Sequence, residues 1–174
     1  MEARDKAVDS LRETTADRKR ERKNRKMMED LPVLERVVIE PEGIDLNLYK
    51  KIGEEVTRVV EHKPGQLYIK EIIRPKYGLK DNTPLPPSEM RSVEIAAMPL
   101  LTIYKGIAGP TLLAEILLQK YEYHLPFYRQ VKQFRHLGFK ASESTIDGWF
   151  TPTVELLKPL YEVLKSEIMK SDYL

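Results

Sequence analysis

The sequence contains no cysteine, which excludes disulfide bridges and thiolate metal sites. The absence of cysteine also suits a protein of a reducing, intracellular compartment. No apolar run approaches the roughly 18 residues that a membrane-spanning helix needs. The N-terminal sequence MEARDKAVDS has no apolar signal core. We therefore expect neither a membrane span nor secretion.

Net charge is also small, because 29 Lys and Arg residues against 27 Asp and Glu residues leave only +2. Bulk charge therefore does not indicate a nucleic-acid partner, and any such case rests on local clusters. Recognisable catalytic patterns are missing as well. The three histidines, His62, His124 and His136, are far apart in sequence, and no HExxH, phosphate loop or nucleophile elbow is present. We predict no catalytic residue, no metal ligand set and no cofactor.

The first of four segments, residues 1–30, is a charged arm that we expect to be helical or disordered. Its dense basic run, RKRERKNRK, covers Arg18 to Lys26. Apolar side chains are too sparse to bury a face, which favours a solvated helix or a disordered arm. The functional alternative is an arm that contacts phosphates, because clustered Lys and Arg displace counterions from a nucleic-acid backbone.

Residues 31–79 have the pattern of a small β module. VLERVVIE, residues 33–40, is rich in β-branched residues and stops before Pro41. EEVTRVVEHK and QLYIKEIIRP flank the turn pair Pro64-Gly65 and predict a hairpin. A sheet of two or three strands is too small to be stable without packing on another element. The apolar residues expected to cover it are Val56, Val59, Val60, Leu67, Ile69, Ile72 and Ile73.

Residues 80–105 contain four prolines and predict a linker or extended arm. Residues 106–174 then have helical periodicity. Pro110 suits the first turn of one helix, and Pro126 and Gly138 suit the start and stop of a second. Ser142 suits the N-cap of a short third helix, and a last helix is expected from Pro152 to about residue 170. The expected inward faces are Leu112, Leu113, Ile116 and Leu117; Phe127, Val131, Phe134 and Leu137; Ile146, Trp149 and Phe150; and Leu156, Leu157, Leu160, Tyr161, Leu164 and Ile168.

These patterns predict an α+β, mainly α fold, in which a small β-hairpin module precedes a helical, helix-turn-helix-like domain. In a helix-turn-helix, the N-terminal side chains of the second helix reach base edges in the major groove. The residues expected there are Ser142, Glu143, Ser144 and Thr145. Basic side chains on the preceding helix and turn are expected to hold phosphates, namely Arg129, Lys132, Arg135 and Lys140. Asp147 would oppose phosphate.

A plain helical bundle is the alternative interpretation of the same pattern. In it, Ser142 serves only as a helix cap and contacts no DNA. Trp149 is expected in the core under both interpretations, because its spacing from Ile146 places the two side chains on one helix face. Residue pattern alone leaves the two interpretations open.

Three blocks of the sequence resemble a known family. They are KKIGEEVTRVVEHKPGQLYIKEIIRPKYGL, KGIAGPTLLAEILLQKYEYHLPFYRQVKQFRHLGFKASESTIDGWF and ELLKPLYEVLKSEIMKSDYL. In this order they are similar to the N-terminal half of transposases of the insertion-sequence-66 family, over about residues 32–174. The resemblance implies a bacterial, cytoplasmic and nucleoid-associated protein that recognises the ends of a mobile element.

The resemblance also implies a catalytic, RNase H-like domain with three metal-binding carboxylates, which we expect to lie beyond residue 174. Asp172 falls just before that point and is not expected to be catalytic. Many family members carry cysteine pairs around the hairpin, which give a zinc-ribbon-like finger. Here the second strand is followed by KYGLKDN and the chain has no cysteine, so we expect a degenerate, metal-free remnant.

Two functions of different kinds follow from this sequence. The first is binding of double-stranded DNA at element termini, without a catalytic site in this chain. The alternative is an oligomerisation or interaction module that assembles with itself or with full-length transposase, and so inhibits it. A decayed gene product without a selected function is a third interpretation.

Overall fold

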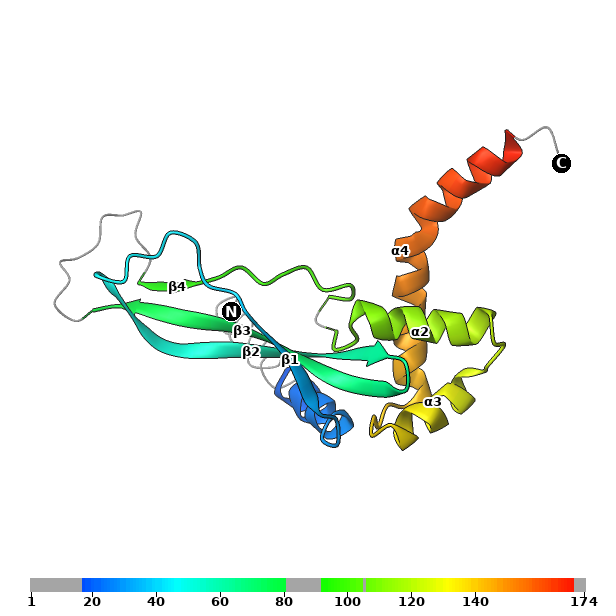
Figure 1. The fold of residues 1–174 in the computed structure, drawn as a ribbon, viewed down its shortest axis with the longest axis horizontal. Coiled ribbons are helices and arrows are strands. Elements are labelled where there is room, and N and C mark those ends of the chain that lie inside the picture. The colour runs from blue at the N-terminus through cyan, green and yellow to red at the C-terminus, as the bar shows by residue number, and fades with distance from the viewer. Residues whose placement is uncertain (1–16, 81–91, 105, 171–174) are drawn as a thin grey trace, which may run out of the picture.

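The computed structural model describes residues 17–80, 92–104 and 106–170. The first 16 residues of the expected arm, residues 81–91 of the expected linker and Asp172 lie outside them. A helix at residues 17–27 leads into a sheet, and helices follow the sheet (Figure 1). The further elements are β1 (Val33–Val38), β2 (Tyr49–Lys63), β3 (Gln66–Leu79), β4 (Val93–Ile95), α2 (Pro110–Tyr121), α3 (Phe127–His136) and α4 (Glu143–Met169).

The expected hairpin is confirmed. β2 pairs with β3 in antiparallel register from Tyr49↔Leu79 to Lys63↔Gln66. Gly65 follows Pro64 in the turn with a φ of +80°, which a type II turn requires at its third position and which glycine adopts without strain. Both strands are longer than the apolar pattern indicates, so the hairpin forms a long ribbon that reaches away from the helices (Figure 1).

Two more strands flank β3 on its other side. β1 runs parallel to β3, and β4 pairs antiparallel with residues 76–78 of β3. The expectation of a mainly α fold is therefore wrong: helices take 42% of the described residues and strands 27%, in a mixed α+β arrangement with the sheet first. The predicted hairpin strands stop at Glu54 and Pro75, whereas β2 begins at Tyr49 and β3 ends at Leu79. The residues that the pattern misses include Lys50, Lys51 and Lys76, and lysine has low β propensity. Charged pairs across the strands stabilise the hairpin near this boundary, with 2.9 Å between Arg74 Nη2 and Glu55 Oε2.

The helix starts also follow the sequence. Pro110 occupies the first turn of α2, and Pro126 is the N-cap of α3. The expected boundary at Pro152, however, is wrong: α4 is one helix of 27 residues that contains both Pro152 and Pro159. A proline inside a helix removes one backbone hydrogen bond and bends the helix, and α4 changes direction along its length (Figure 1). The buried side chains of Ile146, Trp149 and Thr153 hold its first half against the other helices across this point.

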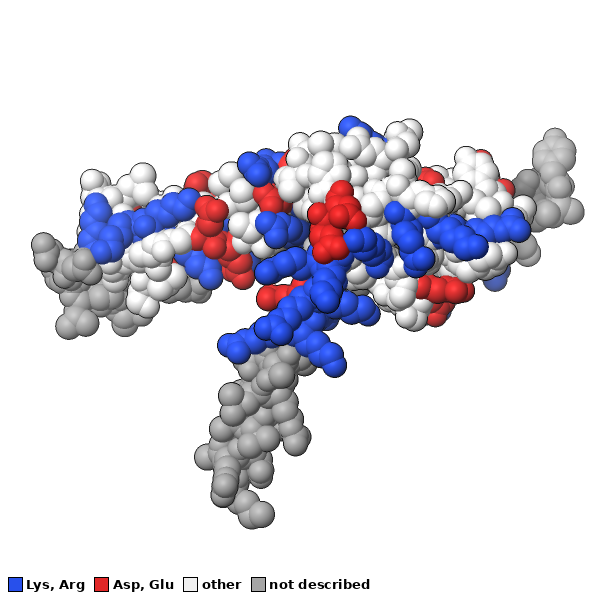
Figure 2. Space-filling view, turned by 90° about the horizontal axis from the view of Figure 1, so that it is seen from below, with Lys and Arg blue, Asp and Glu red and all other residues white. Residues whose placement is uncertain are grey.

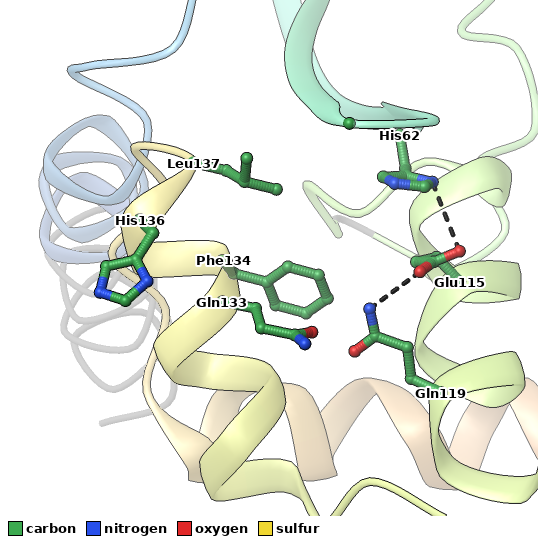
Figure 3. Close-up of a pocket in the computed structure, with 8 residues that line it drawn as sticks. His62, Glu115, Gln119, Gln133, Phe134, His136 and Leu137 are labelled. Atoms are coloured by element: carbon green, nitrogen blue, oxygen red, sulfur yellow. Dashed lines mark hydrogen bonds and ion pairs between the residues drawn. The ribbon is translucent and has the colours of Figure 1, made fainter. Parts of the chain in front are cut away.

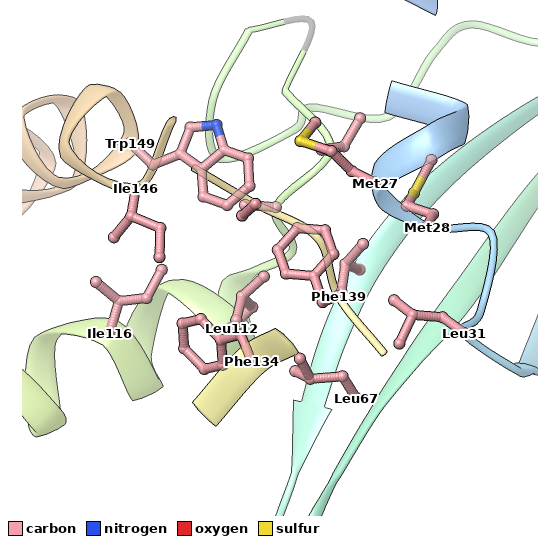
Figure 4. Close-up of a cluster of buried hydrophobic side chains, with 14 of the residues drawn as sticks. Met27, Met28, Leu31, Leu67, Leu112, Ile116, Phe134, Phe139, Ile146 and Trp149 are labelled. Carbon is pink, nitrogen blue, oxygen red and sulfur yellow. The ribbon is translucent and has the colours of Figure 1, made fainter. Parts of the chain in front are cut away.

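One apolar core joins the end of the first helix, the hairpin and the helical region. Met27 ends the first helix, Met28 and Leu31 follow it, and all three pack into the same cluster as Leu67 of the hairpin and Phe139 of the helical region (Figure 4). Burial of aliphatic and aromatic side chains at about 25 cal/mol per Å² is the main stabilising contribution available to such a cluster. Eight residues expected on inward faces are exposed instead: Val56 (40%) and Leu137 (36%), and in the second half of α4 Leu156, Leu157, Leu160, Tyr161, Leu164 and Ile168.

The hairpin is fixed to the helices by backbone hydrogen bonds. The N–H of Val60 donates to the carbonyl of Ile107 at 2.6 Å, and the N–H of Gly109 donates to the carbonyl of Val60 at 2.8 Å. Residue 108 therefore bridges to β2 in parallel, directly before α2 begins. Because Val60 is fully buried, this junction gives the helices a defined position on the hairpin.

Candidate nucleic-acid interface

The turn between α3 and α4 has a specific backbone geometry. The N–H of Phe139 donates to the carbonyl of Phe134 at 2.8 Å, and the N–H of Gly138 donates to the carbonyl of Arg135 at 3.1 Å. These two bonds form a Schellman motif, which ends a helix with a residue in the left-handed region. Gly138 occupies that position with a φ of +91°. The turn thus reverses the chain within a few residues and sets the start of α4.

Ser142 caps α4, as the sequence predicts. Its Oγ accepts a hydrogen bond from the backbone N–H of Thr145 at 3.3 Å. The same Oγ lies 2.7 Å from Oγ1 of Thr145 and 3.1 Å from Oγ of Ser144. Three of the four residues expected at the groove, Ser142, Ser144 and Thr145, therefore bond to one another in the cap.

The first turn of α4 nevertheless presents polar groups outward. Glu143 and Ser144 are exposed and Thr145 is half-buried, while Ile146 beneath them is fully buried. Asp147 is exposed on the next turn. In helix-turn-helix proteins, this part of the second helix enters the major groove.

Three of the four expected phosphate-binding residues lie exposed on α3. Arg129 donates from Nε to the hydroxyl of Tyr128 at 3.2 Å, so the two side chains present a cation beside an aromatic ring. Lys132 and Arg135 are exposed and form no ion pair with another residue of the described chain. Since the buried face of α3 carries Gln130, Val131 and Phe134, these three basic residues share its solvent side.

The fourth, Lys140, has a different environment. Its Nζ lies 2.5 Å from Oε1 of Glu29 and 2.8 Å from Oδ2 of Asp30. Hydrogen bonds to Asp30 and Glu29 raise the pKa of Lys140 above its ordinary value. Two carboxylates surround this ammonium group, which makes it a weaker candidate for phosphate contact than Lys132 or Arg135. Its observed contact is with the residues that follow the first helix.

The helix at residues 17–27 contributes to this surface, although the sequence pattern does not show that it lies there. The backbone N–H of Lys140 donates to the carbonyl of Met27 at 3.0 Å, so the basic run ends against the turn before α4. Figure 2 shows Lys and Arg side chains gathered over this helix and further ones over the neighbouring surface. The basic run is visible in the sequence, but its position is not, because residues 27 and 140 are far apart along the chain.

A hollow of about 370 Å³ lies between the hairpin tip, α2 and α3 (Figure 3). Its polar groups bond to one another: His62 Nδ1 is 3.5 Å from Oε2 of Glu115, and Gln119 Nε2 donates to Oε1 of Glu115 at 2.8 Å. His136 points away from this pair in Figure 3. Among the described residues, no three metal-ligating side chains are grouped so that they could hold an ion. The hollow is therefore a weaker candidate for a functional site than the exposed polar and basic residues of α3 and α4.

No helix within residues 17–80, 92–104 and 106–170 combines the length and the apolar character that crossing a membrane requires.

Comparison with known proteins gives a family for the helical part. Two curated proteins of Sinorhizobium fredii are similar to the chain, and both are described as uncharacterized. Protein y4hP is 28% identical over 159 residues, which cover 89% of this chain and 27% of y4hP. Protein y4jD is 31% identical over 132 residues, which cover 74% of this chain and 24% of y4jD. The chain therefore spans about a quarter of the length of these relatives.

No solved structure matches the chain. The family model of the transposase IS66 family matches residues 105–174, which include the last residues before α2, the whole of α2 and α3, the turn and α4. The resemblance stated from the sequence is thereby confirmed over these residues, and this segment of the chain matches the transposase IS66 family.

Proposed function

We propose that the chain binds double-stranded DNA at the ends of an insertion sequence, as the recognition part of a transposase, and supplies no catalytic residue itself. The observation that carries this proposal is the α3–turn–α4 unit. Its Schellman turn and serine cap leave Glu143 and Ser144 exposed at the start of α4, and the basic residues of α3, the helix before the turn, are exposed as well. The family match over the same residues supports the same function.

The two helices have separate roles in this proposal. Arg129, Lys132 and Arg135 bind phosphates, and thereby position the protein without reading sequence. Glu143 and Ser144 reach base edges, where a carboxylate accepts from the cytosine amine and a hydroxyl contacts several bases. The bacterial cell's nucleoid is then the expected place of action.

Fluorescence anisotropy with labelled duplexes tests this division. The chain is titrated against a duplex from the element's terminus and against a scrambled duplex, at two salt concentrations. We expect tighter binding to the terminal duplex, and this preference should persist at the higher salt concentration. A chain that binds both duplexes equally weakly, and neither at higher salt, would contradict the proposal.

Variants assign the roles to residues. Lys132→Ala with Arg135→Ala should weaken binding to both duplexes about equally, and each lost phosphate contact should lower the salt slope by about 1. Glu143→Ala with Ser144→Ala should instead reduce the preference for the terminal duplex. Lys158→Ala with Lys165→Ala is the charge-matched control, because both lysines lie on the second half of α4, and Lys158 is about 22 Å along the helix from Glu143. This control should bind like the unmodified chain.

A second function, assembly with a further copy of the chain, is favoured by one specific observation. Every residue of α4 from Val154 onward is exposed, including the apolar residues expected to pack inward. These residues recur at the spacing of a coiled-coil seam, with Val154, Leu157, Tyr161, Leu164 and Ile168 separated alternately by three and four positions. A second α4 is the partner that fits such a seam, and assembly would appear as a rise of sedimenting mass with concentration.

A further inference from the structure

The helix at residues 17–27 concentrates positive charge to a degree that the rest of the chain does not. It contains seven basic residues and two acidic ones, and all seven basic side chains are exposed. Figure 2 shows them as a continuous basic surface over this helix. The seven are Arg18, Lys19, Arg20, Arg22, Lys23, Arg25 and Lys26.

Repulsion between these positive charges destabilises the helix when it is considered alone. Like charges at positions i and i+4 destabilise a helix by about 0.2–0.5 kcal/mol per pair. Arg18 with Arg22, Lys19 with Lys23, and Arg22 with Lys26 are three such pairs. The arrangement is therefore not explained by the stability of the chain alone. A polyanion bound along the helix would relieve the repulsion, since each phosphate neutralises one cation.

The C-terminal end of the helix is held firmly in the structure. Met27 and Met28 are 5% and 7% exposed and belong to the main core, where they pack beside Phe139 (Figure 4). The carbonyl of Met27 accepts the hydrogen bond from the N–H of Lys140, and the ammonium of Lys140 pairs with Glu29 and Asp30. The basic helix is therefore attached to the α3–α4 turn by buried apolar contacts, a backbone hydrogen bond and ion pairs.

This attachment places the C-terminal end of the basic helix next to the start of α4, where the proposed contacts with base edges lie. Lys140 precedes the N-cap Ser142 by two residues, so the basic helix ends where α4 begins. Eleven helical residues extend about 16 Å at 1.5 Å per residue. Along B-DNA this length corresponds to about half of a helical turn, since one turn is about 34 Å. The basic side chains therefore project to one side of the base pairs that α4 would contact.

We propose that the helix at residues 17–27 is a second DNA-binding element, which lies along the phosphate backbone flanking the base pairs read by α4. It adds salt-dependent affinity for duplex DNA and carries no sequence preference. The inference rests on the proposed DNA-binding function, but it concerns a different surface from α3 and α4. Its partner is the phosphate backbone of a rigid duplex, because the helix is fixed relative to the turn that faces DNA in the proposed function.

Salt-dependent binding of one pair of variants tests the proposal. Lys19→Gln with Lys23→Gln removes two exposed charges that form no ion pair with a described residue. For B-DNA the slope of log K against log salt changes by about 0.9 for each phosphate contact. We expect the slope to fall by about 2, with equal loss of affinity for terminal and scrambled duplexes. Lys158→Gln with Lys165→Gln carries the same change of charge on α4 and should leave the slope unchanged.

The outcomes separate this inference from the proposed function. If the arm variant keeps the full salt slope while the unmodified chain prefers terminal DNA, the arm does not contact phosphates and the inference is wrong. If the unmodified chain shows no terminal preference but the arm variant still loses slope on scrambled DNA, the inference holds and the proposed end recognition fails. Equal or tighter binding to single-stranded RNA would also overturn the assignment to duplex DNA.

A hydroxyl-radical footprint on the terminal duplex gives the position of the contact. The unmodified chain should protect the backbone at the α4 site and about half a helical turn to one side of it. In the Lys19→Gln, Lys23→Gln variant, only the flanking protection should disappear. Loss of protection at the α4 site with the flank intact would contradict the proposed placement.

Discussion

Glu61 of the hairpin caps the first turn of α2 through Thr111. The Glu61 carboxylate accepts one hydrogen bond from the backbone N–H of Thr111 at 3.1 Å and another from its hydroxyl. The hydroxyl in turn accepts from the backbone N–H of His62 at 2.7 Å. A buried carboxylate at a helix N-terminus is favoured by the helix dipole and satisfies donors that the helix itself leaves unpaired. This contact therefore ties the orientation of the helical region to the hairpin.

Gly109→Ala should break this contact and lower stability. A Cβ at residue 109 would lie 2.2 Å from the carboxylate carbon of Glu61, so the carboxylate must move away from Thr111. Loss of hydrogen bonds to a buried charged group costs about 1.5–3 kcal/mol, and we expect a loss of that size in urea unfolding. Glu61→Ala should cost a similar amount, and the double variant should cost much less than the two single changes together. Additive losses would show that the two residues act independently.

Gly138→Ala should destabilise the turn that presents α4. At a φ of +91° a side chain is strained by about 1–2 kcal/mol, and the new Cβ would also lie 3.3 Å from the carbonyl oxygen of Asp30. We expect a lower urea midpoint and weaker binding of duplex DNA. Gly148→Ala is the matched control, because Gly148 lies inside α4 with open space around it, and alanine there should stabilise the helix by about 0.5–1 kcal/mol. Equal effects of both substitutions would contradict this account of the turn.

The parts of the fold that sequence predicts are those with local causes. Pro64-Gly65 sets its own turn, Gly138 ends α3, and Ser142 caps the helix that follows it. The parallel pairing of β1 with β3 has no such local cause, because the paired residues are about 35 positions apart in the sequence. The sequence therefore shows that β1 is a strand without showing where it pairs.

The sequence predicts a helix boundary at Pro152, where the structure has the single helix α4, and the reason again lies in tertiary packing. Pro152 is a strong local stop signal, but burial of Trp149 and Thr153 on one face holds the helix together across it. Thr153 also donates from its hydroxyl to the carbonyl of Trp149 at 2.7 Å. At the candidate site, the sequence placed the residues of α3 and the start of α4 on neighbouring elements. It did not reveal that Lys140 pairs with Glu29 and Asp30, since that contact spans about 110 residues.

A charged triad crosses the centre of the sheet. Glu71 of β3 lies opposite Arg36 of β1 and Arg58 of β2 in the strand register. Its two carboxylate oxygens accept from Arg36 Nε at 3.0 Å and from Arg58 Nε at 2.9 Å. The hydrogen bond from Arg58 is the largest cause that holds the pKa of Glu71 below its ordinary value of 4.5, and Arg36 adds to it. One carboxylate therefore joins β1, β2 and β3.

Glu71→Gln should lower stability in a pH-dependent manner. Because the folded-state pKa is lowered, the carboxylate stabilises the fold above pH 4.5, and this contribution is lost as the pH falls through the folded-state pKa. At pH 7 we expect a loss of about 1 kcal/mol, below the usual range for hydrogen bonds to charged groups, because water screens the two exposed arginine side chains. The difference in urea midpoint between the two chains should shrink as the pH is lowered below 4.5. Glu54→Gln, at an exposed ion pair with Lys51, is the control and should show little difference at either pH. A constant difference across this range would mean that Glu71 acts by packing alone.

Leu164→Glu should abolish any self-association through α4 without unfolding the chain. Leu164 is 57% exposed and lies within the apolar seam, so a carboxylate there costs little in the monomer but would be buried in a paired helix. Sedimentation velocity over a hundredfold range of concentration should show a rise in mass for the unmodified chain and none for the variant. Ser166→Glu adds the same charge two positions away, at the outward position of the heptad, and should associate like the unmodified chain. If the unmodified chain stays a monomer at every concentration, a second copy of the chain does not cover this face of α4. The chain would then be expected to bind duplex DNA as a monomer.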